Sequence, residues 1–278
     1  MSGCGLTFKL GDLLAAVPSG LTSLELNSAA FARDSYGDII DDFGMSHGWD
    51  GRTRRWRRLR QLRRLVVAGD TSCFFLGGYH FPVHITILSS LRHLELTDQR
   101  GLELEPGHLT RLPAGLTCLK LTVSYNPGGE PLGVVRGPEA LVQFEGHAPY
   151  AGDLRFWDLS GLNLGSLKAL KLSLLHGSED ADEPHLPEWL GAFEALETLE
   201  LGSGPKGIAG NLAALARSLR ELTVGPMLQP GTLAGLSQLT RLQLTRAYHA
   251  PTVIEGREAL AAFTAPRSSA PFPPAAVE

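Results

Sequence analysis

The sequence predicts an α/β solenoid, in which stacked units form a parallel β-sheet on a concave face and carry helices or irregular segments on the convex face. Three observations predict this fold. A pattern with apolar residues at its first, fourth and sixth positions recurs along the 278-residue chain, its copies are spaced at similar intervals, and the variable residue between the last two apolar positions alternates in charge over the middle copies. Recurrence at such an interval is typical of repeat architectures.

The pattern occurs in eight clear copies, which begin at Leu21, Leu62, Leu91, Leu116, Leu167, Leu196, Leu219 and Leu239. Two of the intervals are about double the others, so we expect each to contain a degenerate copy, Ile40–Met45 and Leu141–Gly146. A weak last copy is Leu260–Phe263. In each copy the period of two sends the fourth and sixth residues to one side of a short strand.

These copies resemble the leucine-rich repeat family, whose unit of 20–29 residues holds a short strand with this pattern. The resemblance covers about residues 10–263 and implies a curved horseshoe with an exposed concave sheet. Leu112–Leu116 and Val17–Leu21 are similar to a Leu-Pro-x-x-Leu step of intracellular repeats. No subfamily is assigned, because the Asn or Cys that many members carry after the strand is replaced by other residues.

Three regions are expected along the chain. Residues 1–20 form an N-terminal capping segment with a short amphipathic stretch, residues 21–263 a solenoid of about ten repeats, and residues 264–278 a disordered tail rich in Pro and Ala. Apolar residues three and four apart predict convex-side helices over Leu186–Phe193 and Ile208–Arg217. A final helix over Arg257–Phe263 is expected to cover the last repeat.

The variable strand residues predict a ladder of alternating charge, formed by Glu95, Lys120, Glu145, Lys171 and Glu200. Parallel strands in register lie about 4.8 Å apart, so opposite charges would be neighbours and would each contribute about 0.2–1 kcal/mol. The ladder needs the degenerate copy at Leu141 to keep its alternation. It either supports the register of the strands or awaits a partner.

Composition excludes several classes of protein. The hydrophobic fraction of 43% excludes global disorder, and 25 Lys and Arg against 29 Asp and Glu, a net charge of −4, exclude a chain dominated by attraction to nucleic acid. No signal peptide or membrane span is recognised, and no membrane partner is expected. Cys4, Cys73 and Cys118 form no metal-binding or disulfide pattern, so we expect an intracellular, cytoplasmic location, with the nucleus left open.

One basic run stands out, with eight arginines around Trp56. A functional interpretation is a patch for RNA, phosphate or another acidic partner. The alternative is a helix that buries Trp56, Leu59 and Leu62 and leaves the arginines in solvent, with nearby aspartates such as Asp34, Asp38 and Asp50 as counter-charges. The run comprises Arg52, Arg54, Arg55, Arg57, Arg58, Arg60, Arg63 and Arg64.

Signals for catalysis are few, and we predict no enzyme, no cofactor and no metal site. Gly202–Gly207 matches the G-x-G-x-x-G loop of nucleotide-binding folds, and an enzyme with a nucleotide loop there is a third hypothesis. Against it, Pro205 interrupts the loop and Glu221 lies inside the next expected strand. His93 and Cys118 share a position on adjacent strands and could form a thiolate–imidazole pair, but no third group is recognised.

The leading hypothesis is therefore a non-catalytic interaction module or scaffold that binds another protein on its concave sheet. This is what the repeat architecture implies, since stacked repeats create extended concave binding surfaces. The expected contact residues are Arg64, Arg92, His93, Glu95, Lys120, Lys168, Lys171, Glu197, Glu200, Arg220, Glu221, Arg241 and Gln243. Binding of RNA or phosphate by the arginine run is the alternative.

Overall fold

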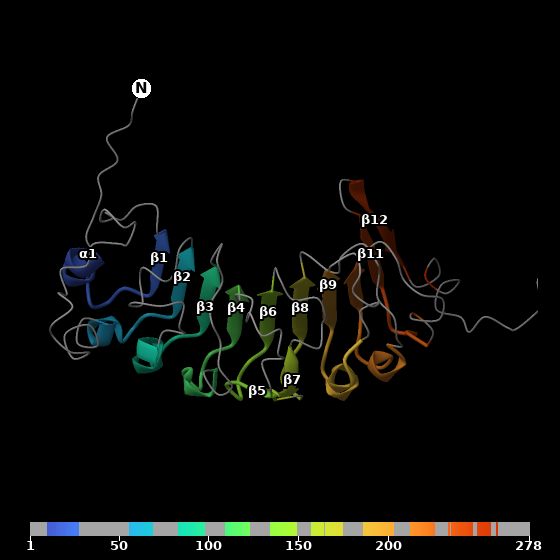
Figure 1. Cartoon of the computed structure of the whole chain (residues 1–278), viewed down its shortest axis with the longest axis horizontal. Coiled ribbons are helices and arrows are strands. Elements are labelled where there is room, and N and C mark those ends of the chain that lie inside the picture. The colour runs from blue at the N-terminus through green and yellow to red at the C-terminus, as the bar shows by residue number, and fades with distance from the viewer. Residues whose placement is uncertain are drawn as a thin grey trace, which may run out of the picture.

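The repeat units stack side by side along one continuous sheet (Figure 1). The structure is a computed structural model, and it describes residues 10–27, 56–68, 83–97, 109–122, 134–148, 157–163, 165–174, 186–202, 212–225, 233, 235–246, 249–256 and 260.

The main sheet has ten strands, in the order β1-β2-β3-β4-β6-β8-β9-β10-β11-β12. Each pair of neighbours is parallel except β11 and β12, which are antiparallel. The strands are β1 (Ser23–Asn27), β2 (Arg64–Ala68), β3 (His93–Thr97), β4 (Cys118–Thr122), β6 (Gln143–Ala148), β8 (Ala169–Leu174), β9 (Thr198–Gly202), β10 (Glu221–Val224), β11 (Arg241–Arg246) and β12 (His249–Glu255). All eight clear copies of the pattern, and the degenerate copy at Leu141, contain one strand of this sheet.

A repeated backbone contact sets the register. At the start of each repeat, two successive N–H groups donate to one carbonyl of the preceding repeat, as Arg92 and His93 do to the carbonyl of Arg63 at 2.8 and 2.9 Å. The same contact recurs from Thr22 to Thr240. Residues at the same position of successive repeats are therefore neighbours, which confirms the predicted parallel-sheet solenoid.

The return segments differ from the prediction. Where helices were expected over Leu186–Phe193 and Ile208–Arg217, the structure has 3-10 helices of five and three residues, η7 (Glu188–Ala192) and η8 (Ala213–Leu215). The other short helices are η2 (Arg57–Leu59), η4 (Val83–Ile87) and η5 (Leu109–Arg111). A 3-10 helix has three residues per turn and is used in short pieces, so a few residues return the chain while burying one side chain each, Leu190 and Leu215 in these two cases.

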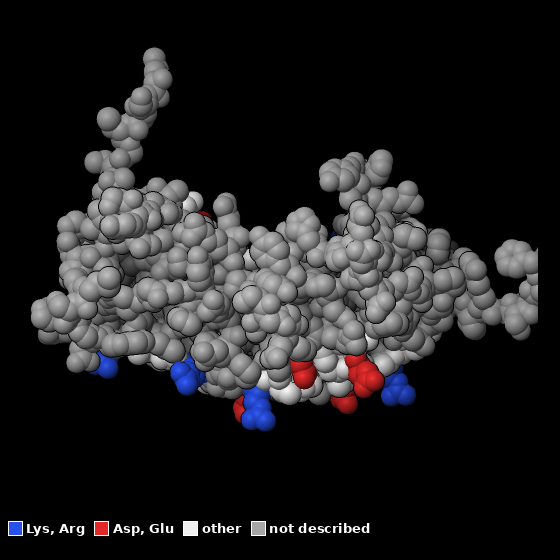
Figure 2. Space-filling view, viewed as in Figure 1, with Lys and Arg blue, Asp and Glu red and all other residues white. Residues whose placement is uncertain are grey.

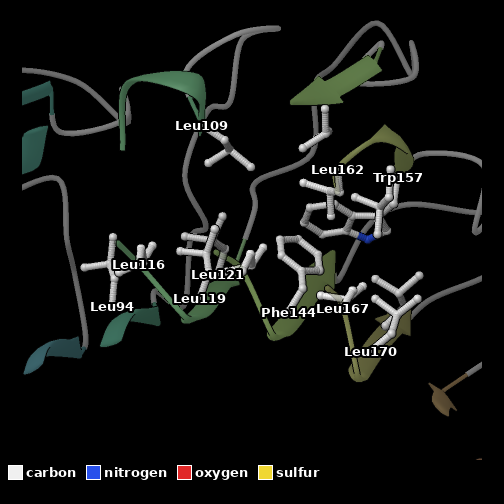
Figure 3. Close-up of a cluster of buried hydrophobic side chains, with 14 of the residues drawn as sticks. Leu94, Leu109, Leu116, Leu119, Leu121, Phe144, Trp157, Leu162, Leu167 and Leu170 are labelled. Atoms are coloured by element: carbon white, nitrogen blue, oxygen red, sulfur yellow. The ribbon is translucent and has the colours of Figure 1, made fainter. Parts of the chain in front are cut away.

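The core lies between the sheet and the return segments. Most leucines at the first, fourth and sixth positions are buried, and Leu91, Leu94 and Leu96 are each 0% exposed; Leu21 and Leu244, in the first and last copies that the sheet contains, are partly buried. Figure 3 shows leucines of the main sheet, such as Leu119, below Leu109 and Leu162, which belong to the second layer, formed by the return segments. Each unit has a single apolar side, so stacking is what removes these side chains from water.

A second, two-stranded parallel sheet lies in the second layer and was not predicted. It joins β5 (Val134–Arg136) and β7 (Asp158–Gly161). Trp157, directly before β7, is 0% exposed and makes an edge-to-face contact with Phe144 of β6, with ring centroids 5.5 Å apart (Figure 3). This layer covers the middle of the main sheet.

An element outside the repeat pattern lies at each end of the chain of repeats. Helix α1 (Leu10–Ala16) lies before β1 and buries Leu14 in the core. At the other end β12, which the pattern did not predict, lies antiparallel to β11. Leu260 is buried in the same core.

Several other expectations concern the remaining residues. The degenerate copy Ile40–Met45 was expected to supply a strand between β1 and β2, but these two strands pair directly, so that prediction is wrong. Residues 40–45 themselves, most of Arg257–Phe263 and the tail 264–278 lie outside the described residues. Of the helices that the structure describes, none is both long and apolar enough to cross a membrane.

Candidate binding surface

The side of the main sheet that faces away from the core is the candidate binding surface, here called the strand face. The register aligns its side chains in three columns. The first column includes Arg64, His93, Cys118, Gln143, Ala169, Thr198, Glu221 and Arg241; the central column Glu25, Val66, Glu95, Lys120, Glu145, Lys171, Glu200, Thr223 and Gln243; and the third Thr97, Thr122, His147, Ser173 and Gly202.

The central column contains the predicted charge ladder. Glu95, Lys120, Glu145, Lys171 and Glu200 are consecutive partners in the register. The Lys120 ammonium lies 3.1 Å from the Glu145 carboxylate, and Lys171 lies 3.3 Å from Glu145 and 3.2 Å from Glu200. Lys120, Glu145, Lys171 and Glu200 therefore form ion pairs with one another within the sheet.

Glu145 is the electrostatic centre of the ladder. Burial on its own would raise the pKa of this carboxyl, but the hydrogen bond from Lys120 and the charge of Lys171 outweigh burial, and the pKa lies below its ordinary value. The hydrogen bond to Glu145 raises the pKa of Lys120. Burial opposes the charge of Lys171, yet its contacts with Glu200 and Glu145 raise its pKa. All three groups are charged at neutral pH.

Nine of the thirteen predicted contact residues lie on strands of the strand face: Arg64, His93, Glu95, Lys120, Lys171, Glu200, Glu221, Arg241 and Gln243. The other four were assigned to strands but precede them by one residue, because each donates the first of the two repeated backbone bonds: Arg92, Lys168, Glu197 and Arg220. These four lie on the edge at which the strands begin, here called the strand-start edge. There Lys168 and Glu197 form an ion pair at 3.0 Å.

Part of the basic run lies on the same edge. Arg57, Arg58, Arg60 and Arg63 are exposed, while Trp56, Leu59 and Leu62 are buried as the structural alternative predicted. Arg58 donates to the carbonyl of Ala15, and Arg64 lies 3.5 Å from the Glu25 carboxylate. Arg52, Arg54 and Arg55, together with the aspartates proposed as counter-charges, lie outside the described residues.

The proposed pair of His93 and Cys118 is adjacent in register but poorly suited to catalysis. Burial raises the pKa of the Cys118 thiol, and the charges of Glu95 and Glu145 raise it further against the opposing charges of Lys120 and Arg64. The Nε2 atom of His93 lies 3.5 Å from the carboxylate of Glu95. The thiol is protonated at neutral pH, whereas a thiolate is the nucleophilic form.

Sequence reasoning missed a polar contact in the third column. His147 Nδ1 lies 2.5 Å from Ser173 Oγ on the neighbouring strand. Burial lowers the pKa of His147, and the nearby charge of Lys171 lowers it further while Glu145 raises it. The imidazole is therefore neutral at neutral pH. The register that predicts the ladder would have paired these two residues, had it been extended by two positions.

The Gly202–Gly207 loop is described only at its first residue, which ends β9; Ser203–Gly207 lie beyond what the structure describes. Within the described ranges no group of three or more His, Cys, Asp or Glu side chains is placed to hold a metal ion.

Comparisons with known proteins give one result in structure and none in sequence. No family model matches the chain, and no curated protein matches it. Among solved structures, a plant peptide hormone receptor, RGFR1, in complex with RGF2, is similar over 82% of this chain and 32% of the receptor chain, with 19% sequence identity and a TM-score of 0.42. The chain thus spans about a third of the length of that receptor chain.

Proposed function

We propose that the chain is a non-catalytic protein-binding module and that its partner binds on the strand face. One observation carries the proposal: nine parallel strands present side chains in register on a single open face, while the opposite face is buried in the core. The side chains of that face are polar or charged at most positions. Such a surface recognises another folded protein by shape and by placed charges.

The size of the face supports the proposal. Ten strands spaced about 4.8 Å apart span about 43 Å, and strands of five residues at about 3.3 Å each are about 16 Å long. The resulting area of about 700 Å² is close to the roughly 800 Å² that each partner contributes to a standard protein–protein interface.

The structure also suggests how the partner would be held. Lys171 and Glu200 are about two-fifths exposed, at 40% and 39%, so both side chains remain accessible although they form an ion pair. A partner that offers a carboxylate to Lys171 and a cation to Glu200 would add to the ladder without disrupting it. Pairing of this kind gives specificity more than affinity.

The test uses two double variants with equal changes of charge. Lys171→Gln with Glu200→Gln removes an ion pair from the strand face between β8 and β9, and Lys168→Gln with Glu197→Gln removes one between the same repeats at the strand-start edge. Tagged wild-type chain and both variants, each shown to be folded by circular dichroism, are used to capture partners from an extract of the source cells. Cross-linking with mass spectrometry then locates the contact.

The proposal predicts a protein that is captured by the wild type and by the Lys168/Glu197 variant and is lost with the Lys171/Glu200 variant. Equal capture by all three chains would move the partner off the strand face. The proposal includes a cytoplasmic location, which fluorescence microscopy of the tagged chain in its own cells tests.

A further inference from the structure

Five arginines on the strand-start edge of the first repeats, here called the arginine edge, have side chains that make no ion pair or hydrogen bond among the described residues. They are Arg57, Arg60, Arg63, Arg92 and Arg111, and all five are exposed. In Figure 2 the described charges along the lower edge are blue toward the N-terminal end and become mixed with red toward the C-terminal end.

These arginines come from three successive repeats. Arg63 and Arg92 occupy the same position in successive repeats, and the Arg92 N–H donates to the Arg63 carbonyl at 2.8 Å. Arg57 and Arg60 are three residues apart around η2, which places them on one side of a 3-10 turn. Arg111 ends η5, directly before the turn that leads to β4.

The guanidinium of Arg92 lies against Gly115, which has no side chain to exclude it. A Cβ atom on Gly115 would lie 1.5 Å from Nη1 of Arg92, so the guanidinium occupies the space of the missing side chain. Arg92, directly before β3, therefore extends over the turn that follows Arg111. This contact places the guanidinium of the third repeat beside the turn that follows Arg111 in the fourth repeat.

The arginine edge lacks compensating charge where the structure describes it. Residues 56–63, 83–92 and 109–117 contain no Asp or Glu. Farther along, Glu188 and Glu194 lie among the return segments, and the Glu197 carboxylate pairs with Lys168. The arginines of the first repeats thus lie in described segments without Asp or Glu, whereas the exposed Arg217 and Arg220 lie on repeats that also carry Glu194 and Glu221.

We propose that the arginine edge binds an acidic segment of the partner protein, a run of Glu or Asp side chains; this rests on the proposed protein-binding function and names the chemistry of the partner. Arginine is suited to this role because its guanidinium forms paired hydrogen bonds with a carboxylate and remains charged. The acidic segment docks beside the strand face, so one partner contacts both surfaces.

The structure favours an acidic protein segment over a nucleic acid. Proteins that hold single-stranded nucleic acid stack its bases on aromatic side chains. Trp56, within the arginine run, is only 4% exposed, and the exposed large hydrophobic residues in the described part of the chain are Val134, Val142 and Val253. In its described part, the edge thus offers carboxylate-binding groups without an exposed Trp or Phe on which bases could stack.

The test measures binding of three labelled probes by fluorescence anisotropy at low ionic strength: an oligoglutamate peptide, an oligoglutamine peptide of equal length and an oligouridylate. The chain is used whole. We expect oligoglutamate to bind more tightly than the other two. Equal binding of the two peptides, or tighter binding of the oligouridylate, would overturn the proposal.

Matched variants locate the site. Arg63→Gln with Arg92→Gln removes two charges from the arginine edge, and Arg217→Gln with Arg220→Gln removes two exposed charges farther along, where Arg220 holds the same repeat position as Arg63. The first variant should weaken oligoglutamate binding by about fivefold, as expected for two exposed ion pairs. The second should leave it unchanged, and an equal loss in both would overturn the proposal.

Gly115→Ala adds a variant that retains every charge. It displaces the end of the flexible Arg92 side chain, so the chain should remain as stable while oligoglutamate binding weakens. Unchanged binding would contradict the position assigned to Arg92. Failure of the peptide to bind leaves the partner-capture result on the strand face as a separate outcome, so the two proposals can fail independently.

Discussion

The ammonium of Lys120 on β4 lies 3.1 Å from the carboxylate of Glu145 on β6. These residues are 25 positions apart in sequence, and they meet because each occupies the variable position between the last two apolar positions of its repeat pattern. Lys171 continues the contact to β8 and Glu200 to β9. The ladder thus fixes four successive strands in register while it faces solvent.

Lys171→Glu should destabilise the fold. Residue 171 lies between Glu145 and Glu200, so the substitution replaces two attractive contacts with two repulsive ones. We expect the free energy of unfolding to fall by about 1–2 kcal/mol in urea titrations, in line with cross-strand charge pairs. Lys168→Glu, which loses only a more exposed contact with Glu197, should cost no more than about 0.5 kcal/mol. Equal losses would show that the ladder adds nothing to stability.

Glu145→Gln should change how stability depends on acid. The pKa of Glu145 is lowered in the folded chain, so its contribution is present above the ordinary value of 4.5 and is lost as pH falls through the folded value. Wild type and variant should therefore differ in free energy of unfolding at neutral pH and converge below about pH 4. Urea titrations across this range provide the measurement, and a constant difference between the two chains would contradict the ladder's control of Glu145.

His147 should titrate below its ordinary pKa of 6.5, as burial beside Lys171 dictates. A base with a lowered pKa stabilises the fold above the unfolded value, and this contribution decreases as pH falls below about 6.5. Histidine chemical shifts in a pH titration should show the shift directly. Ser173→Ala removes the hydroxyl 2.5 Å from Nδ1 and should move the titration midpoint, whereas an unmoved midpoint would mean that the contact does not influence the imidazole.

Cys118 should react slowly in the folded chain. Burial raises the pKa of its thiol, and only the thiolate is reactive. In a chain with Cys4→Ser and Cys73→Ser, we expect a disulfide reagent such as DTNB to modify Cys118 more than about tenfold faster after unfolding in urea than before. Rapid reaction in the folded chain would restore the His93–Cys118 pair as a candidate for chemistry.

Most of the sheet could be predicted from the sequence. The leucines at the fourth and sixth positions must both point to the buried side of a strand, so their spacing of two marks each strand. Elements outside the pattern were missed for physical reasons: β12 is antiparallel and β5 has only three residues, so neither carries the apolar spacing. The same pattern could not separate Arg92 from a strand residue, since its backbone bond to Arg63 sets the strand's start. Contacts that depend on the direction of a side chain, such as that of Arg92 with Gly115, cannot be predicted from a single sequence.

Gly146 offers a sharper test of the packing. It takes the sixth position of its repeat, where the neighbouring strands hold Leu121 and Leu172, so the repeat pattern alone suggests that leucine would improve the core. In the structure a Cβ atom on Gly146 would lie 2.8 Å from Trp157 and 2.9 Å from Phe144. The indole of Trp157 thus occupies the space that a leucine fills elsewhere.

Gly146→Leu should therefore destabilise the chain by about 1–3 kcal/mol, as overpacking does. Val224→Leu, at the same repeat position in β10, adds a single methylene to a side chain that is already accommodated and should cost less than Gly146→Leu. Trp157→Ala alone opens a cavity and should cost about 3–5 kcal/mol. Combined with Gly146→Leu it should cost clearly less than the sum of the two, because the leucine then has room; additive losses in urea titrations would show that Trp157 and residue 146 do not share that space.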